Sequence, residues 1–77
     1  MRIMNLSELE QYTEELSKKY NVKASITEQG KHFGGMWITE WYLIINNQKI
    51  LVGSDYDPIT IDELKSNIEN TIKENKT

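Results

Sequence analysis

Apolar side chains recur along this chain with two different periods, and the change of period outlines the elements. Between about Leu6 and Tyr20 they fall three or four residues apart, which is the spacing of one helical face. This stripe consists of Leu6, Leu9, Tyr12, Leu16 and Tyr20. Two capping boxes compete for the start of the helix, one made by Asn5 with Glu8 and the other by Ser7 with Glu10.

The middle of the chain changes to the alternation that is typical of strands. Residues 22–29, VKASITEQ, alternate apolar and polar side chains and predict a half-buried strand. We interpret residues 30–35 as a loop, and residues 36–45, rich in β-branched and aromatic side chains, as a second strand. Asn46-Asn47 predicts a two-residue hairpin turn because asparagine tolerates positive φ, and QKILV, residues 48–52, is the return strand.

A second helix follows a connection at residues 53–58. Thr60 and Glu63 form a capping box, and Ile59 is placed to contact Leu64 across the first turn. The predicted buried stripe is Ile61, Leu64, Ile68 and Ile72. The chain is therefore expected to be a single α+β domain over residues 1–77, in the order α-β-β-β-α. The strands should form a three-stranded antiparallel meander, with both helices packed on one face.

The Asn46-Asn47 turn also predicts which side chains share a face of the sheet. It pairs Leu43 with Ile50 and Trp41 with Val52, and alternate residues of a strand point the same way. The expected core face carries Val22, Ala24, Ile26, Trp37, Thr39, Trp41, Leu43, Ile45, Gln48, Ile50 and Val52. The opposite face carries Lys23, Ser25, Thr27, Met36, Ile38, Glu40, Tyr42, Ile44, Lys49 and Leu51.

Four side chains of that opposite face, Ile38, Tyr42, Ile44 and Leu51, form an apolar patch with charged neighbours if nothing covers them. An apolar patch of this kind on a small protein commonly marks a contact surface. A homodimer interface is one alternative, and a register slip that exchanges the two faces is another.

Composition and charge exclude several classes of function. The chain has no cysteine, so neither a disulfide nor a thiolate nucleophile is available. No apolar run approaches the roughly 20 residues that span a bilayer, and no signal-like core follows Met1, so a cytoplasmic protein without membrane contact is expected. The net charge is −3, and Asp55, Asp57, Asp62 and Glu63 come before any base in residues 53–77. These acids disfavour a phosphate backbone and suit a basic protein surface, unless they are only a solvated helix start.

Catalytic chemistry is not indicated by any constellation of residues. His32 is the only histidine, and no serine stands in a nucleophile-elbow setting. Asp55 and Asp57 supply too few oxygen ligands for a calcium loop, and the glycines do not match a phosphate-binding spacing. We therefore expect no enzyme, no cofactor and no metal.

The αβββα order is that of the double-stranded RNA-binding domain, and GKHFG lies where that family has a histidine-bearing loop. That family grips phosphates with a lysine cluster at the start of its last helix. Here this position reads Thr60-Ile61-Asp62-Glu63, and two carboxylates would repel the phosphates. Nucleic acid is therefore not the expected partner.

The segments YNVKASITEQ and WYLIINNQKILVGSD, followed by an acid-led helix, resemble the small αβββα anti-CRISPR proteins that block Cas9. The chain is also rich in Ile, Lys, Asn and Glu, the composition of AT-rich phage and mobile-element reading frames. In that family, acids occupy the arginine-lined site that reads target DNA. The resemblance implies that this role falls to Asp55, Asp57, Asp62 and Glu63.

We thus expect a non-enzymatic phage or mobile-element inhibitor that binds a host protein with a basic surface. Its apolar anchors would be Ile38, Tyr42, Ile44 and Leu51, together with His32 and Phe33 of the neighbouring loop. The alternatives are an atypical nucleic-acid-binding module and a homodimeric structural protein.

Overall fold

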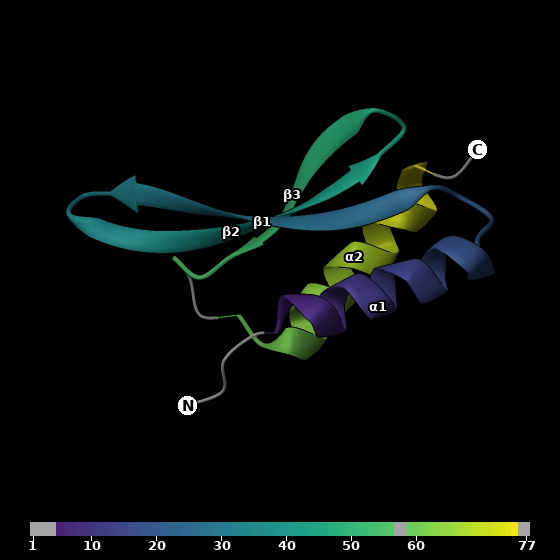
Figure 1. Ribbon diagram of the computed structural model, residues 1–77, viewed down its shortest axis with the longest axis horizontal. Helices are drawn as coiled ribbons and strands as arrows, with labels where there is room; N and C mark the ends of the chain where they lie inside the picture. The colour runs from purple at the N-terminus through teal and green to yellow at the C-terminus, as the bar shows by residue number, and fades with distance from the viewer. Residues whose placement is uncertain (1–4, 57–58, 76–77) are drawn as a thin grey trace.

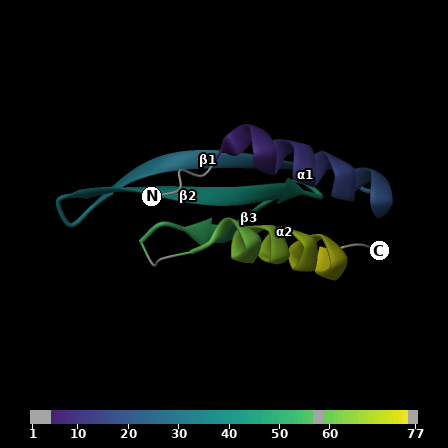
Figure 2. The ribbon, with the colours of Figure 1, turned by 90° about the horizontal axis from the view of Figure 1, so that it is seen from below.

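The computed structural model describes residues 5–56 and 59–75 and confirms the α+β class and the order of elements. Helix α1 spans Leu6–Lys19, the strands are β1 (Ala24–Phe33), β2 (Met36–Ile45) and β3 (Gln48–Ser54), and helix α2 spans Ile61–Asn75. The strands form one antiparallel sheet in the order β1-β2-β3. Both helices lie against one face of this sheet, as expected, and no described element covers the other face, here called the open face (Figure 1, Figure 2).

Each helix begins with a side-chain cap. The Asn5 side chain accepts a hydrogen bond of 2.9 Å from the backbone N–H of Ser7, so Asn5 is the N-cap residue of α1. At α2, the Thr60 hydroxyl accepts a hydrogen bond from the backbone N–H of Glu63 and donates one to its carboxylate. The Thr60–Glu63 capping contact is therefore confirmed, with the carboxylate turned to the threonine hydroxyl.

The connection between β1 and β2 is shorter than predicted. Residues 30–33 belong to β1 and pair with β2, and only Gly34 and Gly35 form the turn. Their φ angles of +57° and +82° are conformations that glycine adopts without steric cost. The loop predicted over residues 30–35 is thus wrong, because a Gly-Gly pair alone closes a two-residue hairpin.

The second hairpin is confirmed at its turn and shifted at its far end. Asn46 and Asn47 both have positive φ, and the pairs that follow have the predicted register. A bulge then pairs Trp41 with Gly53 instead of Val52. Gly53 is in contact with α2: a Cβ built on it would lie 2.6 Å from Leu64 Cδ1 and 3.1 Å from Ile59 Cδ1. The predicted Trp41–Val52 pair is therefore wrong, although both side chains are buried.

The core fills the space between the helices and the covered face of the sheet. It consists of Leu9, Leu16, Ile26, Trp41, Leu43, Ile45, Val52, Ile61, Leu64, Ile68 and Ile72. The predicted stripe of α2 is buried in full. Thr13 of α1 is also buried, and its hydroxyl donates to the Leu9 carbonyl at 2.8 Å, which satisfies the one buried polar side chain among the described residues.

Candidate functional site

Large apolar side chains are exposed mainly at one end of the molecule. The exposed members among the described residues are Phe33, Met36, Trp37, Ile44, Leu51 and Tyr56. Phe33, Met36 and Trp37 belong to the β1–β2 hairpin tip, Tyr56 follows β3, and Leu51 in the middle of β3 lines a hollow with Phe33 and Tyr56. The β1–β2 hairpin extends past the ends of both helices, on the left of Figure 1 (Figure 1, Figure 2). We call Phe33, Met36, Trp37, Leu51 and Tyr56 the hairpin-end surface.

Trp37 is the most exposed of these side chains, at 77%. The sequence predicted it on the core face beside Trp41, and the strand alternation does place both on the same side. The helices, however, do not reach the projecting hairpin, so Trp37 is left in solvent and its predicted burial is wrong. Its indole packs on His32, with ring centroids 5.1 Å apart at an angle of 50°.

The open-face side of the same hairpin holds a shallow hollow of about 270 Å³. Phe33 and Tyr56 contact each other edge to face there, with ring centroids 5.4 Å apart. The lining residues are Lys31, Phe33, Ile38, Glu40, Leu51, Ser54 and Tyr56. Ile38 is only 9% exposed, so this predicted anchor lies at the base of the hollow instead of on its rim.

A polar network separates this hollow from Ile44 on the open face. The Tyr42 hydroxyl donates to the Glu40 carboxylate at 2.7 Å, and Lys49 lies 4.5 Å from the centre of the Tyr42 ring. Lys49 also donates to the Gln29 side chain at 2.9 Å. The hydrogen bond to Glu40 raises the pKa of the Tyr42 phenol above its ordinary value. The predicted patch of Ile38, Tyr42, Ile44 and Leu51 is consequently divided into two parts by charged and polar groups.

The predicted acidic residues are dispersed: Asp55 directly precedes Tyr56 of the hairpin-end surface, whereas the acids of α2 lie in the helix layer. Asp55 donates its backbone N–H to the Thr39 carbonyl at 3.0 Å, and its carboxylate accepts from the Thr39 N–H at 2.7 Å. Asp62 and Glu63 are exposed in the first turn of α2, in the helix layer and away from the open face. Asp57 lies outside the described residues.

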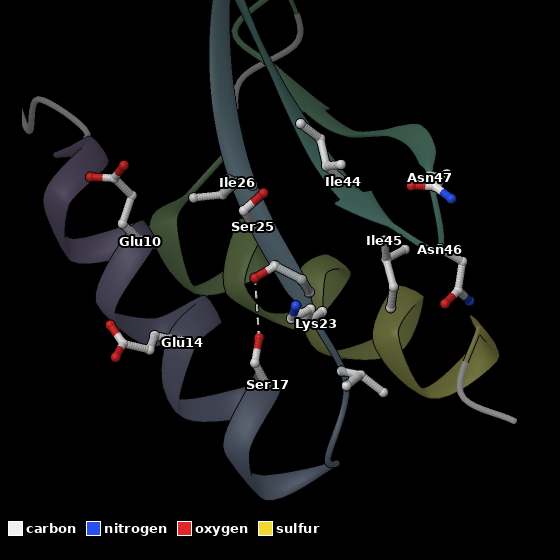
Figure 3. Close-up of a pocket in the computed structure, with 12 residues that line it drawn as sticks. Glu10, Glu14, Ser17, Lys23, Ser25, Ile26, Ile44, Ile45, Asn46 and Asn47 are labelled. Atoms are coloured by element: carbon white, nitrogen blue, oxygen red, sulfur yellow. Dashed lines mark hydrogen bonds between the residues drawn. The ribbon is translucent and has the colours of Figure 1, made fainter.

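A groove of about 670 Å³ extends from α1 along the start of β1 to the end of β2 and the Asn46-Asn47 turn (Figure 3). Glu10 and Glu14 project from the helix on one side, and Ser25 and Ile26 stand on the strand. The Ser17 hydroxyl, also in the groove, donates to the carbonyls of Thr13 and Ala24 at 2.8 and 3.2 Å. The lining residues include no histidine that could activate this hydroxyl, so the groove provides a shape without a nucleophile and base.

The described part of the chain offers neither a metal-ligating cluster nor a helix that could span a membrane. Residues 5–56 and 59–75 contain no group of three or more His, Cys, Asp or Glu side chains placed to hold a metal ion. Neither α1 nor α2 is long and apolar enough to cross a membrane.

Comparisons with known proteins provide no relative for this chain. No protein-family model matches it, and neither a curated protein nor a solved structure resembles it at a significant level. What the surface does must therefore be inferred from its own residues.

Proposed function

We propose that this chain acts without catalysis, by binding another protein through the hairpin-end surface. The observation that carries the proposal is the position of the exposed apolar side chains. Phe33, Met36, Leu51 and Tyr56 are each about half exposed and Trp37 is more exposed still. Phe33, Met36 and Trp37 lie at the hairpin tip, and Leu51 and Tyr56 line the hollow beside Phe33. Aromatic residues and methionine are enriched at protein interfaces, where a few large side chains supply most of the binding energy.

The geometry of the hairpin supports the same proposal. Residues 30–38 of β1 and β2 extend beyond the last pair that β3 makes, so this part of the sheet has two strands only. Isolated two-stranded hairpins are marginally stable in water. Exposed rings on both of its faces, His32 with Trp37 on one and Phe33 with Tyr56 on the other, give the hairpin a surface that a partner can enclose.

A narrower proposal comes from the resemblance to anti-CRISPR proteins: the chain inhibits a host defence protein, such as a CRISPR effector, in the cytoplasm of a bacterium. In that form a basic partner surface meets the acids. Asp62 and Glu63 support it, because both are exposed at the start of α2. If Asp62→Lys with Glu63→Lys leaves inhibition of Cas9 cleavage unchanged, the narrower proposal fails.

The nucleic-acid alternative has less support, because the start of α2 lacks the exposed lysine cluster that the double-stranded RNA-binding family uses there. Lys65 is the lysine nearest to the start of α2, and its ammonium group lies 3.1 Å from the Glu8 carboxylate and 5.2 Å from the Tyr12 ring. It is therefore directed at α1, while Asp62 and Glu63 are the exposed charges.

The proposal is tested by capture from a bacterial lysate with three immobilised proteins. These are the original chain, a Phe33→Ser and Trp37→Ser variant, and a control with Gln11→Ser and Asn70→Ser on the exposed side of the helices. We expect one protein to be retained in near-stoichiometric amount by the original chain and the control, and lost by the hairpin variant. Equal retention by all three, or retention of nucleic acid alone, would refute protein binding through the hairpin end.

A further inference from the structure

The charges of this protein are divided between the two sides of the sheet. Helices α1 and α2 together carry eight acidic side chains and four lysines. Among the described residues, two further acids lie on the covered side, Glu28 in β1 and Asp55 just after β3, and they accept hydrogen bonds from the Trp41 indole and the Thr39 backbone N–H. The helix side of the molecule is therefore strongly acidic.

The open face has the opposite charge. Its charged residues within the described strands and their immediate flanks are Lys23, Lys31, Lys49 and Glu40. Lys23, just before β1, alternates onto the edge of this face, where it also lines the groove beside Glu10 and Glu14 of α1. Glu40 is mostly buried, with 12% of its side chain exposed, and it is already held by Tyr42 and Lys31. The charge presented to solvent by the open face is consequently that of the lysines.

These lysines stand among apolar side chains. Leu51 and the Phe33–Tyr56 pair lie beside Lys31 around the hollow, and Ile44 pairs with Lys49 across the strands. Lys49 is held in place by the Tyr42 ring and the Gln29 side chain. A partner that covers this face must place apolar side chains against Leu51, Ile44 and the Phe33–Tyr56 pair. It must also place carboxylates against the lysines.

We propose that the open face binds an acidic protein surface, which presents carboxylates to Lys23, Lys31 and Lys49 around an apolar centre. This inference rests on the proposed function, protein binding through the hairpin end, and names the chemistry of the partner. It gives that partner the opposite charge to the basic surface of the narrower proposal, so it replaces that narrower proposal. Complementary charge steers association and fixes the orientation of the two surfaces. A basic partner, by contrast, would be repelled from this face and attracted to the helices.

A nucleic acid is the less favoured occupant of the same face. Phosphate binding gains affinity from each lysine that replaces a counterion, and only three lysines are available here. One of them, Lys31, is already 4.0 Å from the Glu40 carboxylate, and the acidic helices lie directly behind the sheet. The apolar side chains of Ile44 and Leu51 also match a protein partner better than a phosphate backbone.

The test uses three labelled probes and fluorescence anisotropy at low ionic strength. The first probe is a helical peptide with leucines on one face and glutamates on the other, the second has lysines in place of the glutamates, and the third is an oligothymidine. We expect the leucine–glutamate peptide to bind the original chain, and added salt to weaken it because exposed charges are screened.

Two matched variants assign the binding to a face. Lys31→Glu with Lys49→Glu reverses two charges on the open face, and Lys18→Glu with Lys73→Glu makes the same change in net charge on the exposed side of the helices. The open-face variant should bind the leucine–glutamate peptide with about tenfold lower affinity than the original chain. The helix variant should lose less than about twofold in affinity. Circular dichroism confirms that each variant is folded.

Several results would overturn the proposal. The first is that the leucine–glutamate peptide does not bind. The second is that both variants lower the affinity for this peptide equally, and the third is that the leucine–lysine peptide binds more tightly. Binding of oligothymidine that the open-face variant alone abolishes would reassign the face to nucleic acid. If the peptide fails while a captured partner is still lost by Phe33→Ser with Trp37→Ser, protein binding remains and only the charge of the partner surface is refuted.

Discussion

At the scale of single residues, Asp55 shows how a structural role can resemble a binding motif. Its carboxylate accepts a hydrogen bond from the Thr39 backbone N–H, and its own backbone N–H donates one to the Thr39 carbonyl. This contact lies just beyond the end of β3, beside β2. An aspartate in an acid-rich stretch is indistinguishable, from sequence, from one that faces a partner. The contact joins residues sixteen positions apart, so local patterns carry no signal for it.

Replacing Asp55 separates the two roles. Asp55→Ala removes the acceptor for the Thr39 N–H and should destabilise the protein by about 1 kcal/mol. Asp55→Asn keeps a side-chain oxygen that can accept the same bond and should cost less. Urea unfolding of both variants measures the difference. If Asp55→Asn and Asp55→Ala lower the stability equally, the negative charge matters more than the hydrogen-bond acceptor. That result would contradict the proposed role of Asp55 as acceptor for the Thr39 N–H.

Gly53 and Gly30 provide a second comparison at residue scale. A Cβ on Gly53 would lie 2.6 Å from the Leu64 side chain, which is fully buried, whereas one on Gly30 would meet nothing within 4 Å. Gly53→Ala should therefore destabilise the fold by about 1–3 kcal/mol through overpacking. Gly30→Ala should leave stability unchanged or raise it by about 0.5 kcal/mol. Thermal unfolding of the pair checks this, and similar effects for the two would contradict the close packing of α2 on the bulge.

At the scale of elements, the two helices are joined by a polar contact at one end. The Tyr20 hydroxyl, just after α1, donates to the Glu69 carboxylate of α2 at 2.8 Å, and Lys19 lies 3.8 Å from the same carboxylate. The hydrogen bond from Tyr20 lowers the pKa of Glu69, against the opposing effect of its partial burial. A lowered carboxylate pKa stabilises the folded state above the ordinary glutamate range and ceases to do so as the pH falls through the lowered value.

Tyr20→Phe should consequently be less stable than the original chain near neutral pH. The difference should shrink as the pH falls, because protonated Glu69 no longer gains from the contact. Denaturant unfolding at neutral pH and at about pH 3 measures it, with Glu69→Gln as the control for the carboxylate. A difference that is the same at both pH values would show that Tyr20 acts through packing alone.

The elements also show what the sequence could and could not predict. The α2 stripe, the Thr60 cap and the Asn46-Asn47 turn were all predictable, because each depends on residues close together in the chain. Gly34-Gly35 carried an equally local hairpin signal, and reading the surrounding glycines as one loop concealed it. The bulge at Trp41 depends on how closely α2 approaches Gly53, a tertiary contact that no local pattern contains.

At the scale of the whole molecule, the sheet is longer than the layer of helices that covers it. Alternation along β2 correctly groups Trp37 with Trp41, but burial depends on where the helices end, and helix length relative to strand length is not encoded in the alternation. The hairpin-end surface was therefore only partly predictable. Phe33 and Leu51 were among the candidates, whereas Met36, Trp37 and Tyr56 were missed as contact residues.

The same scale decides how charge and apolar surface combine. From the sequence, we assigned the acids and the apolar patch to one contact site, because each is an unusual local concentration of one kind of side chain. In three dimensions the sheet separates them, with Asp62 and Glu63 in the helix layer and Leu51 on the open face. A binding site that uses both at once would have to surround the molecule.

The central claim, that the hairpin end binds a protein, is tested most directly by calorimetry on the captured partner. Trp37→Ala should weaken binding by about 2 kcal/mol, or about thirtyfold, because an exposed tryptophan becomes a buried anchor in the complex. Gln11→Ala, on the exposed side of α1, should leave the affinity unchanged. Unchanged affinity for Trp37→Ala, and likewise for Phe33→Ala, would contradict the claim.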